Sequence, residues 1–390
     1  MEALVVVGSK GSIWGLANLL SRAGFSVDWI AISPLMRSSR FVRSMSVMGS
    51  FEETLQFARD LICTRAKPYD WVIPGDDETA KALGEFDWPC ERKPKLLTTS
   101  TAGGVSHIFS KIGLSQVLRE GGVQTPPFEI AGSSAEAAMA AQRLGYPVLL
   151  KVDQSAGGVG VHQSFCAGDV SRLENLFAGG PLLIQKWIEG RELDLSAIYL
   201  NHELVHFSCA RIESTLTRFG LSVVRTYYPL PLVSEQIFEE LATLGHLLGA
   251  NGFTNISCIE AADGSGRYFF EVDMRPNAWM DYSRFYGEDA AVRIRNWFLT
   301  GAVLTKEGAG NGKKAAPIVI PYFLRMNFQD LARNRHGVWK FIPLADGWVV
   351  LRLLAPIGMQ GMAEMTRLIV PRKMRPAIRR ALHAVGVKYD

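Results

Sequence analysis

Short apolar runs alternate with helical patterns over the first part of the chain. Residues 3–7 form a continuous apolar run, which is typical of a strand buried in a parallel sheet, and a helical pattern covers residues 13–23. A second strand is predicted over 24–32, a helix over 51–66 and a third strand over 69–74. This order predicts a βαβ unit and therefore an α/β domain at the start of the chain.

The middle of the chain favours strands joined by tight turns. A helix is predicted over residues 110–118, and an alanine-rich helix over 133–144 leads into the short apolar run 148–150. Further strands are predicted over residues 182–188, 193–200, 204–212, 253–260 and 268–273, and an amphipathic helix over 235–250. Residues 307–314 have the composition of a linker, and residues 317–355 contain further strand-like runs.

Composition excludes several classes of protein. A length of 390 residues suggests two to three domains, since a domain has about 150 residues. A net charge of +4 is too small to indicate nucleic-acid binding. The five cysteines include no CxxC pair, which argues against a zinc site or a disulfide framework and for a reducing compartment. Residues 1–7 lack the features of a signal peptide, and no apolar run is long enough to span a bilayer, so we expect a cytoplasmic protein.

The first candidate site is the glycine-rich stretch that follows residue 147. A short buried strand delivers Lys151 to a turn that contains Gly157, Gly158 and Gly160. A lysine at the end of a buried strand needs an anionic partner, and glycines let backbone N–H groups approach phosphate oxygens closely. The same residues fit a plain β-hairpin with a glycine turn and a lysine whose ammonium group reaches water. On this stretch alone, both interpretations stay open.

The second candidate site has two carboxylates and a guanidinium spaced two residues apart. Glu271, Asp273 and Arg275 share one face of a predicted strand. Neighbouring acids repel unless a cation lies between them, and Mg²⁺ takes oxygen ligands, so we favour metal binding over a surface strand whose acids are neutralised by the arginine.

Two further stretches have a functional and a structural interpretation. Residues 75–78 follow a strand of the α/β domain, where such sheets bind ligands, although acids there equally suit the start of a helix. Lys111 lies in the first turn of a predicted helix, against the helix dipole, which hints at a function; a solvated lysine is the alternative.

Three other motifs are rejected. The turn over residues 8–15 departs from GxGxxG, and no acid closes the second strand, so an NAD-dependent enzyme is disfavoured. Residues 308–313 are one residue short of a P-loop, and no Ser or Thr follows the lysine. His202 and His206 lie on extended segments with a turn between them, so we do not expect zinc binding.

Four stretches, taken in order, resemble the ATP-grasp superfamily, the carboxylate–amine ligases related to D-alanine–D-alanine ligase, biotin carboxylase and carbamoyl-phosphate synthetase. They are Lys111, Lys151 with its glycine loop, residues 185–188 with Glu192, and Glu271 with Asp273 and Arg275. The resemblance covers roughly residues 1–300. It implies an α/β (α+β) fold with a leading Rossmann-like domain, a small lid domain and a larger antiparallel-sheet domain, and a nucleotide held between the last two. The implied limits are 1–104 for the leading domain, 105–190 for the lid, 191–305 for the larger half and 306–390 for a C-terminal extension of unknown role.

The resemblance assigns the lysines and the glycine-rich loop to phosphate binding. Lys111 and Lys151 match the two lysines that contact ATP phosphates. Residues 155–160 match the mobile flap over these phosphates, in which we expect Gly157, Gly158 and Val159 to contact the nucleotide.

The resemblance assigns the stretch after residue 184 to the nucleoside. Backbone groups of Lys186 and Ile188 match those that face the adenine ring, and Glu192 matches the acid that binds the ribose hydroxyls. Gln185 stands where the family usually has a glutamate, and we expect little loss because an amide oxygen can still accept from the adenine amino group.

The resemblance assigns the acidic strand to Mg²⁺, with Mn²⁺ as a substitute. Glu271 and Asp273 match the metal ligands, and Arg275 matches the arginine that steadies an acyl phosphate. The family usually draws another acid from the preceding strand, and Ser257 stands in that place, so we expect weaker binding of one metal or a ligand from elsewhere.

The reaction that the resemblance implies joins a carboxylate to an amine with release of ADP and phosphate. Lys151 and Arg275 are its expected catalytic residues. An amino acid or a peptide-like molecule is the expected substrate, and the alternative is a non-catalytic nucleotide-binding or scaffold protein.

The sequence does not identify the residues that form the substrate pocket. Arg211, Arg218 and Arg225 are candidates for a carboxylate clamp. Four aromatic residues fit either an apolar pocket or the core: Trp279, Tyr282, Phe285 and Tyr286.

The C-terminal tail is basic, with seven Lys/Arg and one acid over residues 366–390. A solvated basic helix is favoured there over contact with an acidic partner or a membrane surface. A homodimer is a base-rate expectation.

Overall fold

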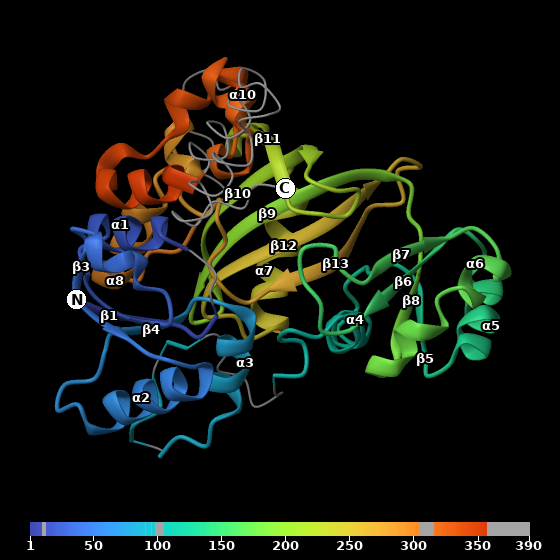
Figure 1. Cartoon of the computed structure of the whole chain (residues 1–390), viewed down its shortest axis with the longest axis horizontal. Coiled ribbons are helices and arrows are strands. Elements are labelled where there is room, and N and C mark those ends of the chain that lie inside the picture. The colour runs from blue at the N-terminus through green and yellow to red at the C-terminus, as the bar shows by residue number, and fades with distance from the viewer. Residues whose placement is uncertain (10–12, 90, 95, 98–104, 305–315, 357–390) are drawn as a thin grey trace, which may run out of the picture.

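The computed structural model describes residues 1–390 except 10–12, 90, 95, 98–104, 305–315 and 357–390. Its strands form three sheets, and Figure 1 shows a small domain set apart from the main body, which holds the other two sheets. The mixed α/β architecture predicted from the sequence is confirmed. The domain limits, the linker over 307–314 and the basic tail stay predictions, and both the linker and the tail lie outside the described residues.

The leading domain is a parallel sheet in the order β3-β2-β1-β4. Its second strand begins at Ser26 and its third predicted strand is β4, as the apolar runs indicated, while β3 was not predicted because its outward positions are polar and exposed. The strands are β1 (Glu2–Val7), β2 (Ser26–Ala31), β3 (Val42–Val47) and β4 (Trp71–Pro74), and the helices are α1 (Gly15–Arg22), α2 (Phe51–Thr64) and α3 (Asp77–Glu85).

The small domain is an antiparallel sheet in the order β5-β8-β6-β7. Two helices cover its outer face, where alanines of α5 allow close packing on Val148, Leu150 and Ile184. The strands are β5 (Phe128–Ala131), β6 (Val148–Val152), β7 (Val161–Ser164) and β8 (Leu182–Lys186), and the helices are α4 (Lys111–Glu120), α5 (Ser134–Leu144) and α6 (Ala167–Ser171).

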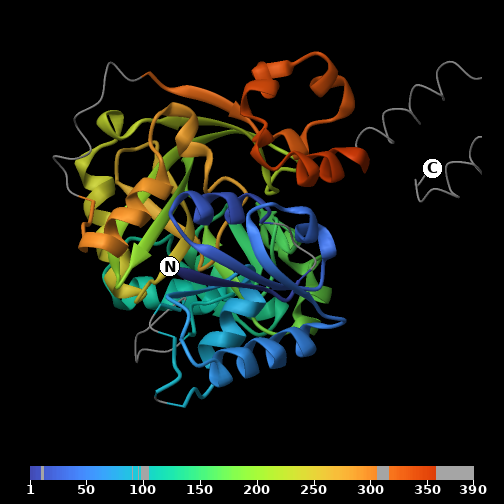
Figure 2. The same ribbon diagram turned by 90° about the vertical axis from the view of Figure 1, so that its left-hand side faces the viewer.

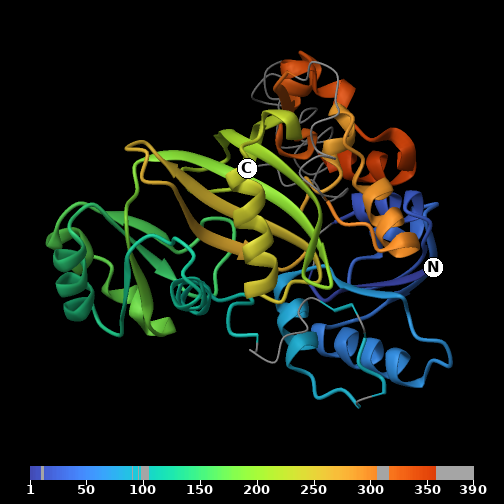
Figure 3. The same ribbon diagram turned by 180° about the vertical axis from the view of Figure 1, so that it is seen from behind.

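The large sheet is antiparallel throughout, in the order β13-β12-β9-β10-β11-β14. Figure 3 shows helix α7 (Glu235–Leu247) lying on one face of this sheet. Its buried apolar residues join the core there, and the other face is left for polar side chains. The strands are β9 (Gly190–Leu200), β10 (Glu203–Thr215), β11 (Ser222–Tyr228), β12 (Gly252–Ala261), β13 (Arg267–Asp273) and β14 (Ile318–Pro321).

The prediction of strand-like runs over 317–355 was wrong for most of that segment. Only β14 is a strand, and residues 323–356 form α10 (Phe328–Ala332), short 3₁₀ helices and a helix over 347–356. Short apolar runs do not distinguish a strand from a buried helix, and here Val349 and Val350 are buried in the same cluster as the leading domain. Figure 2 shows this segment beside the leading sheet. Among the described residues, no helix is long and apolar enough to span a membrane.

One apolar cluster joins the leading domain, the large sheet and the C-terminal segment. Helix α8 (Ala290–Thr300) contributes to it, and Trp71 of β4 stacks on Phe253 of β12 with ring centroids 5.3 Å apart. Both rings are nearly fully buried, so this contact fixes the leading sheet against the end of the large sheet.

We expect Phe253→Ala to lower the free energy of unfolding by about 3–5 kcal/mol, because it removes the stacked ring and leaves a cavity between the two sheets. Urea unfolding measures the loss. Phe165→Ala is the matched control, since that ring is 60% exposed and its removal should change stability by less than about 0.5 kcal/mol. Equal stabilities for the two variants would contradict the prediction.

Candidate functional site

Two adjoining cavities lie between the small domain and the polar face of the large sheet. The hinge cavity, of about 200 Å³, is lined by residues 185–188 and by apolar side chains of β6, β7, β12 and β13. The charged cavity, of about 170 Å³, is lined mainly by charged and amide side chains of α3 and the large sheet. Both cavities are lined by the same residues at their boundary: Lys111, Ser155, Gly158, Glu192, Phe219, Gly220 and Glu271.

Lys151 is buried at the inner end of the hinge cavity. Its side chain is on a central strand of the small sheet, its residue is only 5% exposed, and its Nζ lies 4.8 Å from the centroid of the Phe270 ring. Burial lowers the pKa of Lys151 to about 8, although Glu271 and Glu192 act in the opposite direction. The ammonium group is thus placed where an anion would stabilise its charge.

Gln185 is the only hydrogen-bond partner that the described residues give Lys151. Nζ donates to Oε1 over 2.6 Å. Because an ammonium group only donates, the amide oxygen must face the lysine, and the buried Nε2 is left without an acceptor in the described part of the chain. One lone pair of the amide oxygen that we expected to serve adenine therefore faces Lys151, and its contact with adenine stays a prediction.

Lys111 begins α4 and closes the boundary of the two cavities. Its Nζ donates to the carbonyl oxygens of Asp153 and Ser155. The Asp153 carboxylate accepts from the Ile112 N–H over 2.8 Å and from the Ser110 hydroxyl, so an acid at the helix N-terminus offsets the lysine in the first turn. The misfit seen in the sequence is resolved by this contact between α4 and the end of β6.

The glycine-rich loop lies against the turn between β10 and β11. Gly157, Gly158 and Gly160 all have φ between +63° and +79°. A Cβ atom on Gly158 would come within 2.0 Å of the Phe219 carbonyl oxygen, so that position requires glycine both for conformation and for space. Of the predicted loop residues, Gly157 and Gly158 line a cavity, while Val159 is exposed and lines neither of them.

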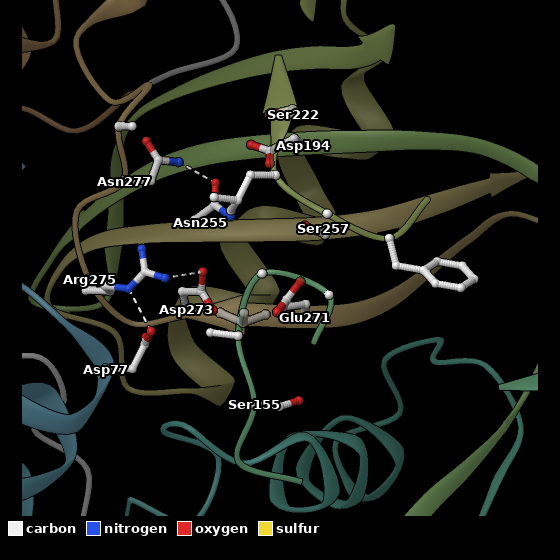
Figure 4. A pocket seen from close by; sticks show the side chains of 18 of the residues that line it. Asp77, Ser155, Asp194, Ser222, Asn255, Ser257, Glu271, Asp273, Arg275 and Asn277 are labelled. Carbon is white, nitrogen blue, oxygen red and sulfur yellow. Dashed lines mark hydrogen bonds and ion pairs between the residues drawn. The ribbon is translucent and has the colours of Figure 1, made fainter. Parts of the chain in front are cut away.

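The acids of the charged cavity are aligned across three strands, as Figure 4 shows. Glu271 on β13 is paired with Ser257 on β12, which is paired with Asp194 on β9. One step along the same face, Asp273 is paired with Asn255. The strand register therefore brings the two predicted metal ligands and the residue that replaces the usual third acid onto one face.

Arg275 joins the large sheet to the leading domain. Its Nε donates to Asp77 Oδ2 over 2.7 Å and its Nη2 donates to Asp273 Oδ2 over 3.0 Å (Figure 4). Of the two acids after β4, Asp76 caps α3 by accepting from the Thr79 N–H, and Asp77 turns into the cavity. The two interpretations of residues 75–78 are thus both realised, each by a different aspartate.

Burial perturbs the two acids that flank Asp273. Removal from water, followed by repulsion from Asp273, raises the pKa of Glu271 to about 7 and that of Asp77 to about 7. Oδ1 of Asp77 accepts no hydrogen bond within the described chain. Such a cluster either holds protons or takes up a cation.

The residues present fit one divalent cation better than two. Glu271 and Asp273 supply carboxylate oxygens, but the described residues contain no group of three or more His, Cys, Asp or Glu side chains arranged to hold a metal ion. Ser257 offers a hydroxyl at the third position. A cation bound here would need further oxygens from a ligand such as a phosphate.

The three arginines considered as a clamp do not act together. Arg225 is buried and pairs with both oxygens of Asp194 over 2.8 and 2.7 Å. Arg218 lines the hinge cavity and donates to Gln163, while Arg211 pairs with Glu213 at a separate hollow.

Of the four aromatic residues considered for a pocket, only Trp279 lines the charged cavity. The others belong to a core cluster: Tyr282, Phe285 and Tyr286.

The sequence did not reveal several residues of the charged cavity. Asp194 and Asn255 could have been found from strand alternation once the register of the large sheet was known. His107, Asn277 and Arg325 come from turns and from the C-terminal segment, where no periodicity signals a site.

No family model matches the chain. Over 258 residues it is 28% identical to the carbamoyl phosphate synthase large chain of Clostridium botulinum (strain Alaska E43 / Type E3). This match covers 64% of the chain and 24% of that protein, so the chain corresponds to about a quarter of the relative's length.

Solved structures share the fold. The biotin carboxylase domain of the Hydrogenobacter thermophilus 2-oxoglutarate carboxylase, in complex with MgADP, ADP and bicarbonate, is similar with a TM-score of 0.58 at 19% identity, over 78% of this chain and 70% of that chain. The L-amino acid ligase from Bacillus licheniformis is similar with a TM-score of 0.56 at 15% identity, over 82% of this chain and 78% of that chain.

The raised pKa of Glu271 predicts how stability depends on pH without ligands. Between pH 4.5 and about 7 the folded chain keeps a proton that the unfolded chain loses, so this contribution to stability is complete below 4.5 and is lost as pH rises through about 7. We expect Glu271→Gln to match the wild type in acid and to be more stable by about 1–3 kcal/mol at about pH 8.

Urea unfolding at several pH values measures this difference. Glu120→Gln, at an exposed helix end, is the control and should follow the wild type throughout. A constant difference between the Glu271→Gln variant and the wild type across this range would overturn the assignment of a raised pKa.

Proposed function

The chain has the ATP-grasp fold, and from this premise we propose that it is an ATP-dependent ligase that joins a carboxylate to an amine. The observation that carries the proposal is that Lys111 and Glu271 lie where the two cavities adjoin, while Lys151 lines the hinge cavity beside them. Two ammonium groups and the carboxylate of Glu271 suit a polyphosphate with its divalent cation. The solved neighbours include a complex with MgADP, which agrees with ATP and Mg²⁺ as the ligands of this chain.

In the proposed complex the hinge cavity holds the nucleoside. Leu149, Val161, Ile259 and Phe270 supply apolar walls for a base, and backbone groups of residues 186–188 supply its polar edge. Glu192 lines both cavities, and its carboxylate can accept hydrogen bonds from the ribose hydroxyls. Because Gln185 keeps its oxygen on Lys151, its free N–H group suits an acceptor atom of the base, such as a ring nitrogen.

The lysines then serve the phosphates. Lys151 lies deep in the hinge cavity and Lys111 at its boundary, so both reach a chain of phosphates that runs toward the charged cavity. Mg²⁺ bound by Glu271 and Asp273 would neutralise the charge on these phosphates. The glycine-rich loop would cover them and exclude water.

The reaction proceeds in two steps. A carboxylate oxygen of the acyl substrate attacks the γ-phosphorus of ATP, and ADP leaves with the electrons of the broken P–O bond. The amine nitrogen then attacks the acyl carbon, and inorganic phosphate leaves. Arg275 stabilises the oxyanion. Asp77 has an Oδ1 without a partner among the described residues and a pKa raised to about 7, so it can accept the proton that the amine loses.

The rival function is nucleotide binding without catalysis. Ser257 favours it, because a hydroxyl is a poor ligand for a hard cation and a weakly held metal leaves the transferring phosphoryl group less neutralised. Release of ADP on incubation with MgATP and a panel of carboxylates and amines separates the two functions. Tight binding of ATP without turnover for any pair would favour the rival.

We expect Lys151→Ala to abolish substrate-dependent release of ADP, because the variant removes the buried cation that faces the phosphates. Circular dichroism should show that the fold is intact. Lys340→Ala, at an exposed position far along the chain, is the matched control and should keep wild-type turnover. Unchanged turnover in Lys151→Ala would contradict the proposed role of Lys151 in binding the phosphates.

We expect Ser257→Glu to tighten Mg²⁺ binding roughly tenfold in the presence of nucleotide, because it supplies the missing carboxylate beside Glu271. The same variant should be less stable than the wild type without Mg²⁺, since it adds a buried like charge. Titration of nucleotide binding with Mg²⁺ measures the first effect and urea unfolding the second. An unchanged Mg²⁺ dependence would show that the cation binds elsewhere.

A further inference from the structure

Arg325 extends from the C-terminal segment into the charged cavity. It follows Tyr322 at the end of β14, in the part of the chain that the family resemblance does not cover. Its Nη1 donates to the carbonyl oxygen of Ser222 over 2.7 Å, and its guanidinium carbon lies 4.8 Å from the centroid of the Tyr322 ring. One hydrogen bond and one ring contact therefore hold a half-buried side chain at the wall of the cavity.

Arg325 has no acidic partner in the part of the chain that the structure describes. The other two arginines of the cavity are paired, Arg225 with Asp194 and Arg275 with both Asp77 and Asp273. Burial lowers the pKa of Arg325, and the nearby charge of Arg225 acts in the same direction, whereas Tyr322, Tyr282 and Asp194 act in the opposite direction. A guanidinium that is partly removed from water beside a second one is an unfavourable arrangement unless an anion joins it.

Trp279 adds a second donor without an acceptor. Its indole Nε1 is buried and has no hydrogen-bond partner among the described residues, although the side chain lines the same cavity. The ring lies under the guanidinium of Arg225 at 4.4 Å and against the ring of Tyr322 at 5.1 Å, the same ring that Arg325 covers. The unsatisfied donors of Arg325 and Trp279 thus belong to one cluster.

This cluster and the acids proposed to bind Mg²⁺ line the same cavity from different strands of the large sheet. Arg325 is fixed to Ser222 at the start of β11, and three strands of the large sheet separate β11 from β13, which carries Glu271 and Asp273. An anion at Arg325 would therefore be held from the β11 side of the cavity, whereas Glu271 and Asp273 are on β13.

We propose that Arg325 binds a second carboxylate of a ligation substrate, one that the reaction does not consume. The proposal rests on the proposed function and names its substrate class: an amino acid or peptide whose amine reacts and whose carboxylate stays free. The planar fork of a guanidinium matches the two oxygens of a carboxylate, which a lysine or a neutral donor would not do. The extension after residue 316 then sets the specificity of a site whose reactive groups lie in the preceding domains.

The test is binding without turnover. Thermal unfolding of the full chain is followed in the absence and presence of L-alanine, L-glutamate and succinate, with L-alaninamide as the probe that lacks a carboxylate. We expect at least one of the three carboxylates to raise the unfolding midpoint of the wild type and L-alaninamide to have no effect. Inorganic phosphate is added in a separate arm.

Arg325→Gln keeps a donor for the Ser222 carbonyl and removes the charge, while Arg325→Lys keeps the charge and removes the fork. We expect the first variant to weaken carboxylate binding roughly tenfold to a hundredfold and the second to weaken it less. Arg335→Gln is the matched control, since that side chain is 62% exposed, pairs with Asp330 and belongs to the same segment. It should bind like the wild type.

Three results would overturn the proposal. They are the failure of all three carboxylates to shift the wild type, an equal shift in Arg325→Gln, and stabilisation by phosphate that Arg325→Gln abolishes, which would make the cluster a phosphate site. Binding of MgATP is measured in parallel and should be unchanged in Arg325→Gln. Failure of the wild type to bind MgATP would refute the proposed function. The carboxylate titrations test the role of Arg325 independently of MgATP binding.

Discussion

The ion pairs of Arg275 are the interaction on which the site depends. One guanidinium neutralises Asp77 from the leading domain and Asp273 from the large sheet, and all three groups are largely removed from water. Taking such charges out of water costs several kcal/mol for each ion, which only a well-placed partner offsets. The position of the leading domain against the sheet is therefore tied to the charge balance of the cavity as well as to the apolar contact of Trp71 with Phe253.

The parts of the fold with a regular period were predictable from the sequence. Alternation placed Glu271 and Asp273 on one face of β13, with Arg275 two residues beyond the end of that strand. The motifs occur in an order that is typical of one fold. Pairings between distant segments were not predictable, because nothing in a local pattern states that Asp77 meets Arg275 or that Asp194 meets Arg225.

The C-terminal segment also shows that local patterns do not predict a structure that depends on tertiary packing. Its apolar runs were assigned to strands, yet tertiary packing against the leading domain makes most of the segment helical. Arg325 reaches the cavity only because that packing holds the segment beside β11.

Two positions of this chain carry a neutral residue where the family usually has an acid, and the contacts around them differ. Gln185 remains bonded to Lys151, so the lysine keeps a partner but loses a counter-charge, which leaves its ammonium group more dependent on phosphate. Ser257 has Glu271 beside it on β13 and Asp194 beside it on β9, and Arg225 already neutralises Asp194. The balance of charge thus shifts toward the cationic side at the proposed nucleotide end and leaves the proposed metal end with two carboxylates.

The sequence separation of the central ion pair has a consequence for biosynthesis. Asp77 precedes Arg275 by 198 residues, so on the ribosome the aspartate is made long before its partner. A leading domain that folds as it emerges must keep Asp77 in water, since an unpaired carboxylate would be costly to bury. The cavity can therefore take its final form only late in translation, and a nascent chain halted before residue 275 should present this acidic end of α3 to solvent.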